Sequence, residues 1–230
     1  MSKDIICNCE NCQLQSLFFA HVTKDVLEDI CVHKIERQHS KGETIIQQGD
    51  PIKEFIYLKS GLVKLIRTTS ENKDQIISFS KPFDFVSVFS VFSSEYYNYS
   101  VIAIDDSITC ILDLEEVKRH ALNNGHFAMD LMYRMSTATD HIIIDNMEIR
   151  KKQLKGRIAH ILLYFARNIY KANNFELPVS RREIAEYIGM TVENVIRTLS
   201  EFRKDGLIKI YGKEILILNE KLLEEVSEHG

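Results

Sequence analysis

The sequence predicts an α+β fold: an amino-terminal antiparallel β-roll, cupin-like in outline, then one long helix, then a small domain of helices and a β-hairpin. Three patterns predict it. From about Lys34 to Leu114, short β-rich runs are separated by Gly, Asp, Asn or Ser every 8–12 residues, as in an all-β roll or barrel. From about residue 120 these runs give way to helical spacing. Near the carboxyl end, two short helical patterns are joined by only three residues, Gly189 to Thr191.

The composition is typical of a globular chain in a reducing compartment. Of 230 residues, 45% are apolar and 27% are charged. No apolar run approaches the ~20 residues that a membrane span needs, and the start, MSKDIICNCENC, lacks an export signal. Five cysteines, with three crowded at Cys7, Cys9 and Cys12, fit reduced thiols or thiolate ligands better than disulfides. We therefore expect a cytoplasmic protein with no membrane partner.

Charge is unevenly distributed along the chain. Residues 1–150 carry 15 Lys and Arg against 22 Asp and Glu, whereas residues 151–204 carry 11 against 5. A basic segment after an acidic one suits an anionic partner that binds one end only, although ordinary surface variation can give similar counts.

The first elements are short. Residues 24–36 have the spacing of a helix, and Gly42, Gly49 and Gly61 mark turns of the β-rich region where a positive φ is tolerated. The expected strands are TIIQQ, FIYLKS, LVKLIRTT, QIISFS, SVIAI and ITCILDL.

The long helix follows, up to about Gln153. Its seam residues alternate in spacings of four and three over about three heptads, which is the pattern of a coiled coil. The expected seam positions are Ala128, Met132, Met135, Thr139, Ile142, Asn146 and Ile149. The pattern favours pairing with a second copy of the chain. The alternative is a long helix that packs on its own β-roll.

The next segments lead to the two short helical patterns. An amphipathic helix is expected from Leu154 to Ile169, and KANNFELPVS is expected to be a polar connector. Ser180 and Glu183 then form a capping box. Gly189 can end the first short helix, and Thr191 can begin the second, which reaches about Lys204. The residues expected to meet between these two helices are Ile184, Ala185, Ile188, Val195, Ile196 and Leu199.

This segment has the pattern of a winged helix-turn-helix. Ala185, Gly189 and Val195 supply a small residue at the helix crossing, a flexible turn and a branched core residue at the spacing of that motif. Downstream, LIKI, YGKE and ILIL predict the strand, turn and strand of the wing. The alternative is an ordinary helical hairpin with a solvated charged face.

The second short helix presents side chains that could read DNA. Glu193, Asn194 and Arg197 project from its start, where a recognition helix meets base edges. An arginine can bind guanine O6 and N7 together, and a glutamate can accept from cytosine N4. Residues expected at the DNA backbone are Ser180, Arg181, Arg182, Thr191, Lys209 and Lys213. Double-stranded DNA is therefore the expected partner.

Four segments are expected. They are a cysteine-containing tail (1–18), a β-roll effector or sensor domain (19–125), a dimerisation helix (126–153) and a winged helix-turn-helix DNA-binding domain (154–230).

From about residue 9 to residue 218, the chain resembles the Crp/Fnr family of bacterial transcription regulators. The stretches KGETIIQQGDPIKEFIYLKSGLVK and TVENVIRTLSEFRKDGLIKI carry the resemblance, together with the long helix. It implies a homodimer on an inverted-repeat operator, with contacts to RNA polymerase. Glu193 and Arg197 match the family's base-reading positions, and Val192 resembles the Fnr branch. Ile196 departs from both branches, which carry serine or glycine there. Val192, Asn194 and Ile196 complete the set of base-reading candidates. A half-site with a central G·A step is expected.

The resemblance also bears on the effector. Family members that bind cyclic nucleotides use a Gly-Glu-Leu segment and a later Arg-Ser pair. Val88 stands at the position of the ribose-binding glutamate, and Asn98-Tyr99 replace Arg-Ser. Without that cation the phosphate would be buried unpaired, so cyclic AMP is not the expected effector. The candidate pocket residues are Val88, Phe89, Ser90, Tyr97, Asn98 and Tyr99, and the aromatic ones either fill the roll or line a site for an apolar ligand.

The cysteine tail permits a second type of sensor. Cys9 and Cys12 match the first two cluster ligands of the family's oxygen-sensing branch. With Cys7 and Cys110 they could supply four thiolates to a [4Fe–4S] cluster or a zinc ion. The remaining alternative is unligated thiols. The oxygen-sensing branch has an acidic residue at the position of Ile142, so its apolar replacement implies a ligand-independent dimer.

Two other classes of protein compete with this interpretation. Metal-dependent oxygenases also use β-rolls, but the chain has no His-x-His pair, no Gly-rich phosphate loop and no nucleophile elbow. We therefore expect no enzymatic activity. The other class is a signalling module that binds a small molecule and a protein partner.

Overall fold

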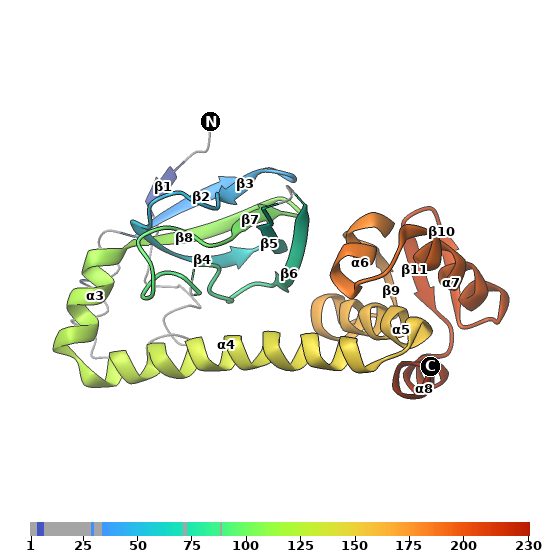
Figure 1. Cartoon of the computed structure of the whole chain (residues 1–230). Coiled ribbons are helices and arrows are strands. Elements are labelled where there is room, and N and C mark those ends of the chain that lie inside the picture. The colour runs from blue at the N-terminus through green and yellow to red at the C-terminus, as the bar shows by residue number, and fades with distance from the viewer. Residues whose placement is uncertain (1–3, 7–28, 30–33, 71–72, 88) are drawn as a thin grey trace. The chain divides into compact units, whose positions relative to one another are not determined.

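The computed structural model describes residues 4–6, 29, 34–70, 73–87 and 89–230 (Figure 1). The chain divides into two compact units, Met1–His141 and Ile142–Gly230. Among the described helices, none is long and apolar enough to cross a membrane.

The first unit is built from two antiparallel four-stranded sheets with the orders β1-β2-β8-β4 and β3-β7-β5-β6. Two helices follow the strands along the chain (Figure 1). The elements are β1 (Asp4–Ile6), β2 (Ile35–His39), β3 (Thr44–Ile46), β4 (Glu54–Ser60), β5 (Val63–Thr68), β6 (Asp74–Ser80), β7 (Ser100–Ala103), β8 (Ser107–Asp113), α3 (Leu114–Asn123) and the first part of α4 (Gly125–Lys151).

All six predicted strands are present, as β3 to β8. The structure adds β1 within the expected tail and β2 where the sequence predicted the last residues of a helix. Of the rest of that predicted helix, only Asp29 and Lys34 are among the described residues. The sequence did not predict strand β2, because two of its buried residues are polar. Glu36 and His39 are 8% and 5% exposed, and His39 Nε2 lies 2.9 Å from Thr109 Oγ1 on β8.

Buried aromatic and aliphatic side chains fill the β-roll. One cluster includes Leu58, Val63 and Leu65, and a second includes Phe55, Leu112 and Phe127. Gly61 shows how close the strands come, because it has a φ of +94° and a Cβ there would lie 2.2 Å from Ser107 Oγ. Only glycine fits such a turn without displacing its neighbour.

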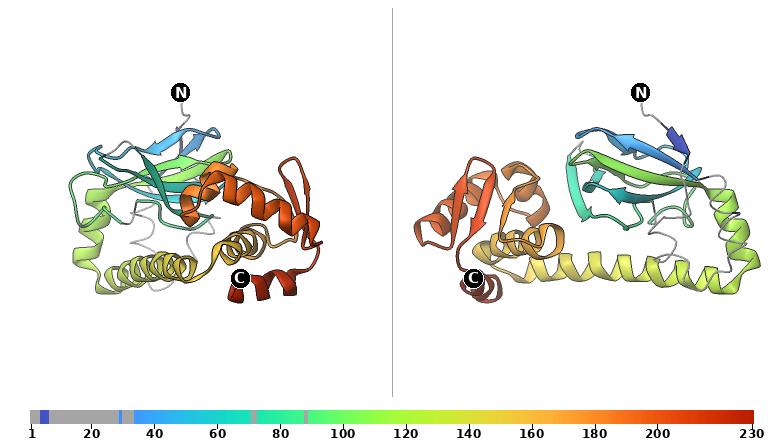
Figure 2. Two further views of the ribbon diagram at one scale, coloured as in Figure 1. Left: turned by 45° about the vertical axis from the view of Figure 1, so that its right-hand side comes forward. Right: turned by 180° about the vertical axis from the view of Figure 1, so that it is seen from behind.

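The second unit contains the end of α4, the two short helices and the β-hairpin. The elements that follow α4 are α5 (Leu154–Tyr164), the π-helix η2 (Phe165–Tyr170), β9 (Asn174–Glu176), α6 (Arg181–Ile188), α7 (Val192–Lys204), β10 (Ile208–Tyr211), β11 (Glu214–Ile217) and α8 (Glu220–His229). Both short helices and both wing strands were predicted from the sequence. Figure 2 shows the hairpin of β10 and β11 beside α7.

The predicted polar connector is partly wrong. Within it, β9 pairs with β11 and makes the wing a three-stranded sheet of order β10-β11-β9. Phe175, Leu177 and Val179 are each at most 5% exposed. These apolar residues recur at every second position, so the segment buries one face as a strand does.

Candidate nucleic-acid interface

Helix α6 begins at the predicted capping box. The Ser180 backbone N–H donates to Glu183 Oε2 at 2.8 Å, and the Glu183 N–H donates to Ser180 Oγ at 3.2 Å. The helix ends at Gly189, whose φ of 66° and ψ of 47° place it in the left-handed region. Thr191 then begins α7, and its side chain accepts from the Asn194 N–H at 3.3 Å. Local hydrogen bonds therefore define both ends of the turn.

The capping box yields a stability prediction. Replacing Ser180 by alanine removes the acceptor for an otherwise orphaned helix-start N–H, so the free energy of unfolding is expected to fall by about 1 kcal/mol. Urea denaturation followed by circular dichroism measures this change. Ser200→Ala on α7 is the matched control, since the Ser200 hydroxyl only donates to the Ile196 carbonyl within its own helix. Equal stabilities of the two variants would contradict the capping role.

One apolar residue expected between the helices lies elsewhere. Ile184, Ala185, Ile188, Val195 and Leu199 are all 3% exposed or less, as predicted. Ile196, however, is 52% exposed, so its assignment to the shared core is wrong. At about 100° per residue, Ile196 follows Val195 around the helix and leaves the side that contacts α6. It joins the exposed face of α7.

The exposed face of α7 carries Glu193, Ile196, Arg197 and Ser200. The Arg197 guanidinium donates to Asn194 Oδ1 at 3.0 Å, and its Nε lies 3.9 Å from Glu201 Oε1. Glu201 also pairs with Lys155 at 2.9 Å. The hydrogen bond from Lys155, aided by Arg197, lowers the pKa of the Glu201 carboxyl. Two side chains of the same helix thus orient Arg197, and both are displaceable because all three lie at the surface.

The predicted backbone-contacting residues surround α7. Arg181 donates to the Gly212 carbonyl oxygen in the wing turn at 3.1 Å, which links the start of α6 to the hairpin. Among the described residues, Arg182 is paired only with Glu186 of its own helix, at 3.0 Å, and its side chain is 81% exposed. Lys209 and Lys213 are exposed on the wing. Ser180 and Thr191 use their side chains as helix caps.

A group of three side chains ties α6 to the end of α4, and the sequence did not predict it. Asp145 on α4 accepts a short hydrogen bond from the Tyr187 hydroxyl on α6, and its other oxygen lies 2.8 Å from His160 Nε2 on α5. Burial, reinforced by the Asp145 charge, raises the pKa of Tyr187 far above its ordinary value. The only signal for this group was a tyrosine among the apolar residues of α6.

Arg157 makes a second connection in the same unit. Its Nη1 donates to the Ile188 and Gly189 carbonyl oxygens at 3.0 and 3.4 Å, at the end of α6. Its Nε donates to the Lys152 carbonyl oxygen at 3.0 Å, and its Nη2 to the Arg150 carbonyl oxygen at 3.5 Å. One guanidinium therefore satisfies carbonyl groups from the ends of two helices.

The exposed apolar face of α4 differs from the predicted seam. Met135 packs on the β-roll core, and Ile149 is 3% exposed within the second unit. The chain's own core therefore takes up the Ile149 side chain and covers part of Met135. The large apolar side chains that α4 exposes are Met129, Met132, Tyr133, Ile143, Ile144 and Met147. At about 100° per residue they fall within roughly 60° of one direction, about one residue along from the predicted seam.

The aromatic effector candidates are core residues. The Tyr97 hydroxyl donates to the Glu54 carbonyl oxygen at 3.1 Å and that of Tyr99 to the Val86 carbonyl oxygen at 3.0 Å. Both rings belong to the buried cluster of the roll, and Phe89 packs against Tyr99. Ser90 is buried with its hydroxyl accepting from the exposed Asn98. Val88 lies outside the described residues.

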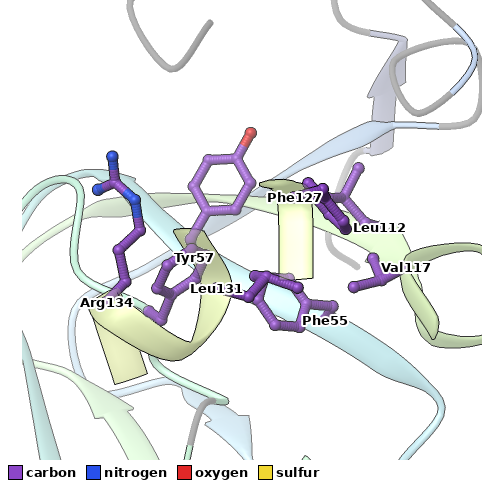
Figure 3. A pocket seen from close by; sticks show the side chains of 8 residues that line it. Phe55, Tyr57, Leu112, Val117, Phe127, Leu131 and Arg134 are labelled. Carbon is purple, nitrogen blue, oxygen red and sulfur yellow. The ribbon is translucent and has the colours of Figure 1, made fainter. Parts of the chain in front are cut away.

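A pocket lies elsewhere in this unit (Figure 3). Figure 3 shows the Arg134 side chain at one end of it and the rings of Phe55 and Phe127 within it. Its lining residues are Phe55, Tyr57, Phe85, Leu112, Val117, Phe127, Leu131 and Arg134, which include none of the five described effector candidates. Its enclosed volume is about 10 Å³, roughly what one water molecule needs. A nucleotide therefore does not fit without a rearrangement of the side chains.

Of the four metal-ligand candidates, only Cys110 is described. Its thiol is fully buried and donates to Glu36 Oε1 at 3.9 Å, and Lys59 Nζ lies 2.6 Å from the same oxygen. A metal ligand must be a thiolate, and complete burial disfavours that charge. The placement of Cys110 does not fit a [4Fe–4S] cluster or a zinc ion. Cys7, Cys9 and Cys12 lie outside the described residues.

Asp29, Glu116 and His120 are gathered in the first unit, close enough to hold a metal ion. Arg119, however, lies among them and pairs with Asp29 at 2.8 Å and with Glu116 at 2.5 Å. The hydrogen bonds that Arg119 donates to these two carboxylates raise its pKa. The group is therefore an ion-pair cluster in which arginine takes the place a cation would occupy.

Comparisons with known proteins agree on one family. Residues 156–226 match the model for a Crp-like helix-turn-helix domain, and residues 36–124 match that for a cyclic nucleotide-binding domain. The transcriptional activator protein FnrA of Stutzerimonas stutzeri is 30% identical over 220 residues, 92% of this chain and 89% of that protein. The fumarate and nitrate reduction regulatory protein of Escherichia coli (strain K12) is 25% identical over 228 residues, 96% of this chain and 91% of that protein.

Solved structures give the same result. FixK2 from Bradyrhizobium japonicum has a TM-score of 0.74 and 25% identity, over 83% of this chain and 96% of that chain. A putative regulator of the Crp/Fnr family from Eubacterium rectale has a TM-score of 0.75 at 22% identity, over 92% and 99%, and shows the shared fold.

Proposed function

Because the chain belongs to the Crp/Fnr family of transcription regulators, we propose that it binds an inverted-repeat operator as a homodimer and responds to an effector other than cyclic AMP. The family is one of DNA-binding regulators and not of enzymes. The finer features proposed are the base-reading residues, the dimer and the effector class. Contact with RNA polymerase and a cytoplasmic location are proposed from the family alone.

The observation that carries the proposal is the exposed face of α7. It presents Glu193 and Arg197 one helical turn apart, with the guanidinium held by Asn194 at 3.0 Å. A guanidinium fixed in this way can donate two parallel hydrogen bonds to guanine, while the carboxylate accepts from a neighbouring cytosine. Together they suit a half-site with a central G·A step. Val192 and Asn194 flank this pair at the start of the helix.

The exposed apolar residues of α4 support a homodimer. In the first unit the helix exposes Met129, Met132 and Tyr133; in the second it exposes Ile143 and Met147. Exposing these apolar side chains to water is unfavourable. The same helix of a second copy of the chain presents the same apolar residues and can pack against them. Ile142, Thr139 and Asn146 adjoin these residues.

The dimer is expected in metal-free protein. The acidic residue that the oxygen-sensing branch has at this position, and that would repel its partner, is replaced by Ile142. Sedimentation velocity at micromolar concentration, with a chelator present, should give the mass of a dimer. A single monomeric species under these conditions would contradict the proposed self-association.

The proposed exclusion of cyclic AMP rests on the chemistry of the pocket. Tyr97 and Tyr99 fill the roll and donate to backbone carbonyl oxygens, and no arginine stands at Asn98 to pair with a phosphate. An unpaired buried phosphate would lose several kcal/mol of hydration. Sensing through a [4Fe–4S] cluster or zinc is not proposed from the described residues, because Cys110 does not fit a thiolate ligand.

DNA binding is tested by selection from a pool of randomised duplexes, followed by titration of the enriched sequence at several salt concentrations. We expect an inverted repeat whose half-sites contain a G·A step, with affinity that falls steeply as salt rises. Cyclic AMP added at millimolar concentration should leave the affinity unchanged. If no motif is enriched, or if retention is insensitive to salt, the helix pair serves another partner and the proposal fails.

A further inference from the structure

Ile196 is an exposed branched apolar residue on an otherwise polar surface. It is 52% exposed, although the apolar spacing placed it between the two helices; the family resemblance instead placed it among the base-reading positions. Its exposed neighbours on this face of α7 are Glu193, Arg197 and Ser200, none of them apolar, and Val192 one turn earlier is only partly exposed. Two apolar residues beside charged ones do not make the contiguous patch that protein partners use. These surroundings indicate that Ile196 contacts a small apolar group on a partner that is otherwise polar.

The position of Ile196 places it among the base readers. At about 100° per residue, Ile196 lies roughly 60° from Glu193 around the axis of α7 and about 100° from Arg197. Val195, Leu199 and Phe202, which are at most 3% exposed, occupy the opposite side. Ile196 therefore lies at one edge of the face that carries Glu193 and Arg197, within reach of a duplex that contacts both. As a β-branched residue in a helix, it holds its methyl groups in one preferred rotamer.

The major groove offers one kind of apolar group, the C5-methyl of thymine or of 5-methylcytosine. We propose that Ile196 determines specificity by packing against this methyl group in each half-site, next to the pair bound by Arg197. This inference rests on the proposed DNA binding and adds a named contact to it. Isoleucine has no donor or acceptor, so an unmethylated cytosine there would lose water from its N4 amino group without gaining a partner. The same side chain thus favours thymine and disfavours cytosine.

The test replaces thymine by deoxyuridine, which removes only the C5-methyl. Starting from the selected operator, each thymine of the half-site is changed in turn and affinity is measured by fluorescence anisotropy. One position should weaken binding about four-fold, the equivalent of about 0.8 kcal/mol for one buried methyl. Changing it in both half-sites should weaken binding about 15-fold. Cytosine there should bind weakly, and 5-methylcytosine should restore part of the loss.

Variants assign the effect to Ile196. Ile196→Ala should bind the thymine and deoxyuridine duplexes equally, while keeping its preference for the G·A step. Ser200→Ala, on the same face one turn later, is the control and should keep the four-fold difference. Circular dichroism of both variants checks the fold, which a change at an exposed position leaves intact.

The outcomes separate this inference from the function on which it rests. An enriched motif with a flat deoxyuridine scan overturns the role of Ile196 and leaves DNA binding standing. A methyl effect that persists in Ile196→Ala also overturns it, since another residue then makes the contact. Enrichment of no motif at all contradicts the proposed function itself.

Discussion

Replacing Arg197 by alanine is expected to abolish discrimination at one base pair of each half-site. The loss is about 1–3 kcal/mol per half-site, or about 2–6 kcal/mol for a symmetric operator. The reason is geometric, because the guanidinium offers two parallel donors to guanine O6 and N7. Its hydrogen bond to Asn194 at 3.0 Å pre-orients the group on the exposed face. Less side-chain freedom is therefore lost when the arginine binds.

The measurement compares affinity for the selected operator with affinity for operators changed at the G·A step. Arg197→Lys keeps the charge and loses the two-donor fork, so it should lose most of the discrimination as well. Arg182→Ala is the matched control, since that side chain is 81% exposed and pairs only within α6. It should weaken binding to all sequences alike and reduce the salt slope by about one. A uniform weakening by Arg197→Ala would instead make Arg197 a phosphate contact.

Replacing Asp145 by alanine is expected to lower the free energy of unfolding of the second unit by about 2–4 kcal/mol. The change removes the acceptor of two hydrogen bonds, from Tyr187 and from His160. The Tyr187 residue is only 8% exposed, so its hydroxyl is left buried without that partner. A buried donor without an acceptor costs about 1–3 kcal/mol, and bonds to a charged group are the stronger ones.

Urea denaturation of the single variants and of the double variant measures the coupling. Tyr187→Phe removes the donor and should cost less than Asp145→Ala, because Asp145 keeps His160. In the double variant the effects should be less than additive by about 1 kcal/mol or more, since the two side chains share one bond. Additive effects would show that the pair contributes no interaction energy. Asp140→Ala on the exposed side of α4 should leave stability nearly unchanged.

Elements with regular local signals were predicted correctly from the sequence. Strands β3 to β8 are short runs rich in β-branched residues, and turn residues separate them. Helices α6 and α7 have capping residues, Ser180, Gly189 and Thr191, whose hydrogen-bond partners lie within four residues in the sequence. Such signals do not depend on the rest of the fold. Strand β2 was missed because Glu36 and His39 are buried polar residues, and their partners, Lys59 and Thr109, lie far away in the sequence.

The errors at the site have a common cause. Helical spacing gives the order of residues around an axis, and it does not say which direction faces a core. On α4 the β-roll core takes Met135, which rotates the exposed stripe by about one residue. On α7 the shared core takes Val195 and Leu199 and leaves Ile196 outside. Asp145 and Arg157 could not be assigned, because their partners are contributed by helices that only the folded unit brings together.

The hydrogen bonds of Arg157 have a consequence for the design of chimeras that carry the DNA-binding unit of this protein. This residue binds carbonyl oxygens at Arg150 and Lys152 as well as at Ile188 and Gly189. The compact unit begins at Ile142, well before the first residue of α5. A chimera that joins a foreign dimerisation helix directly to Leu154 would lack the Arg150 and Lys152 carbonyl groups. Arg157, which contacts the end of α6, would then lose two of its hydrogen-bond acceptors. A transferable DNA-binding segment should therefore comprise residues 142–230, including the last turns of α4.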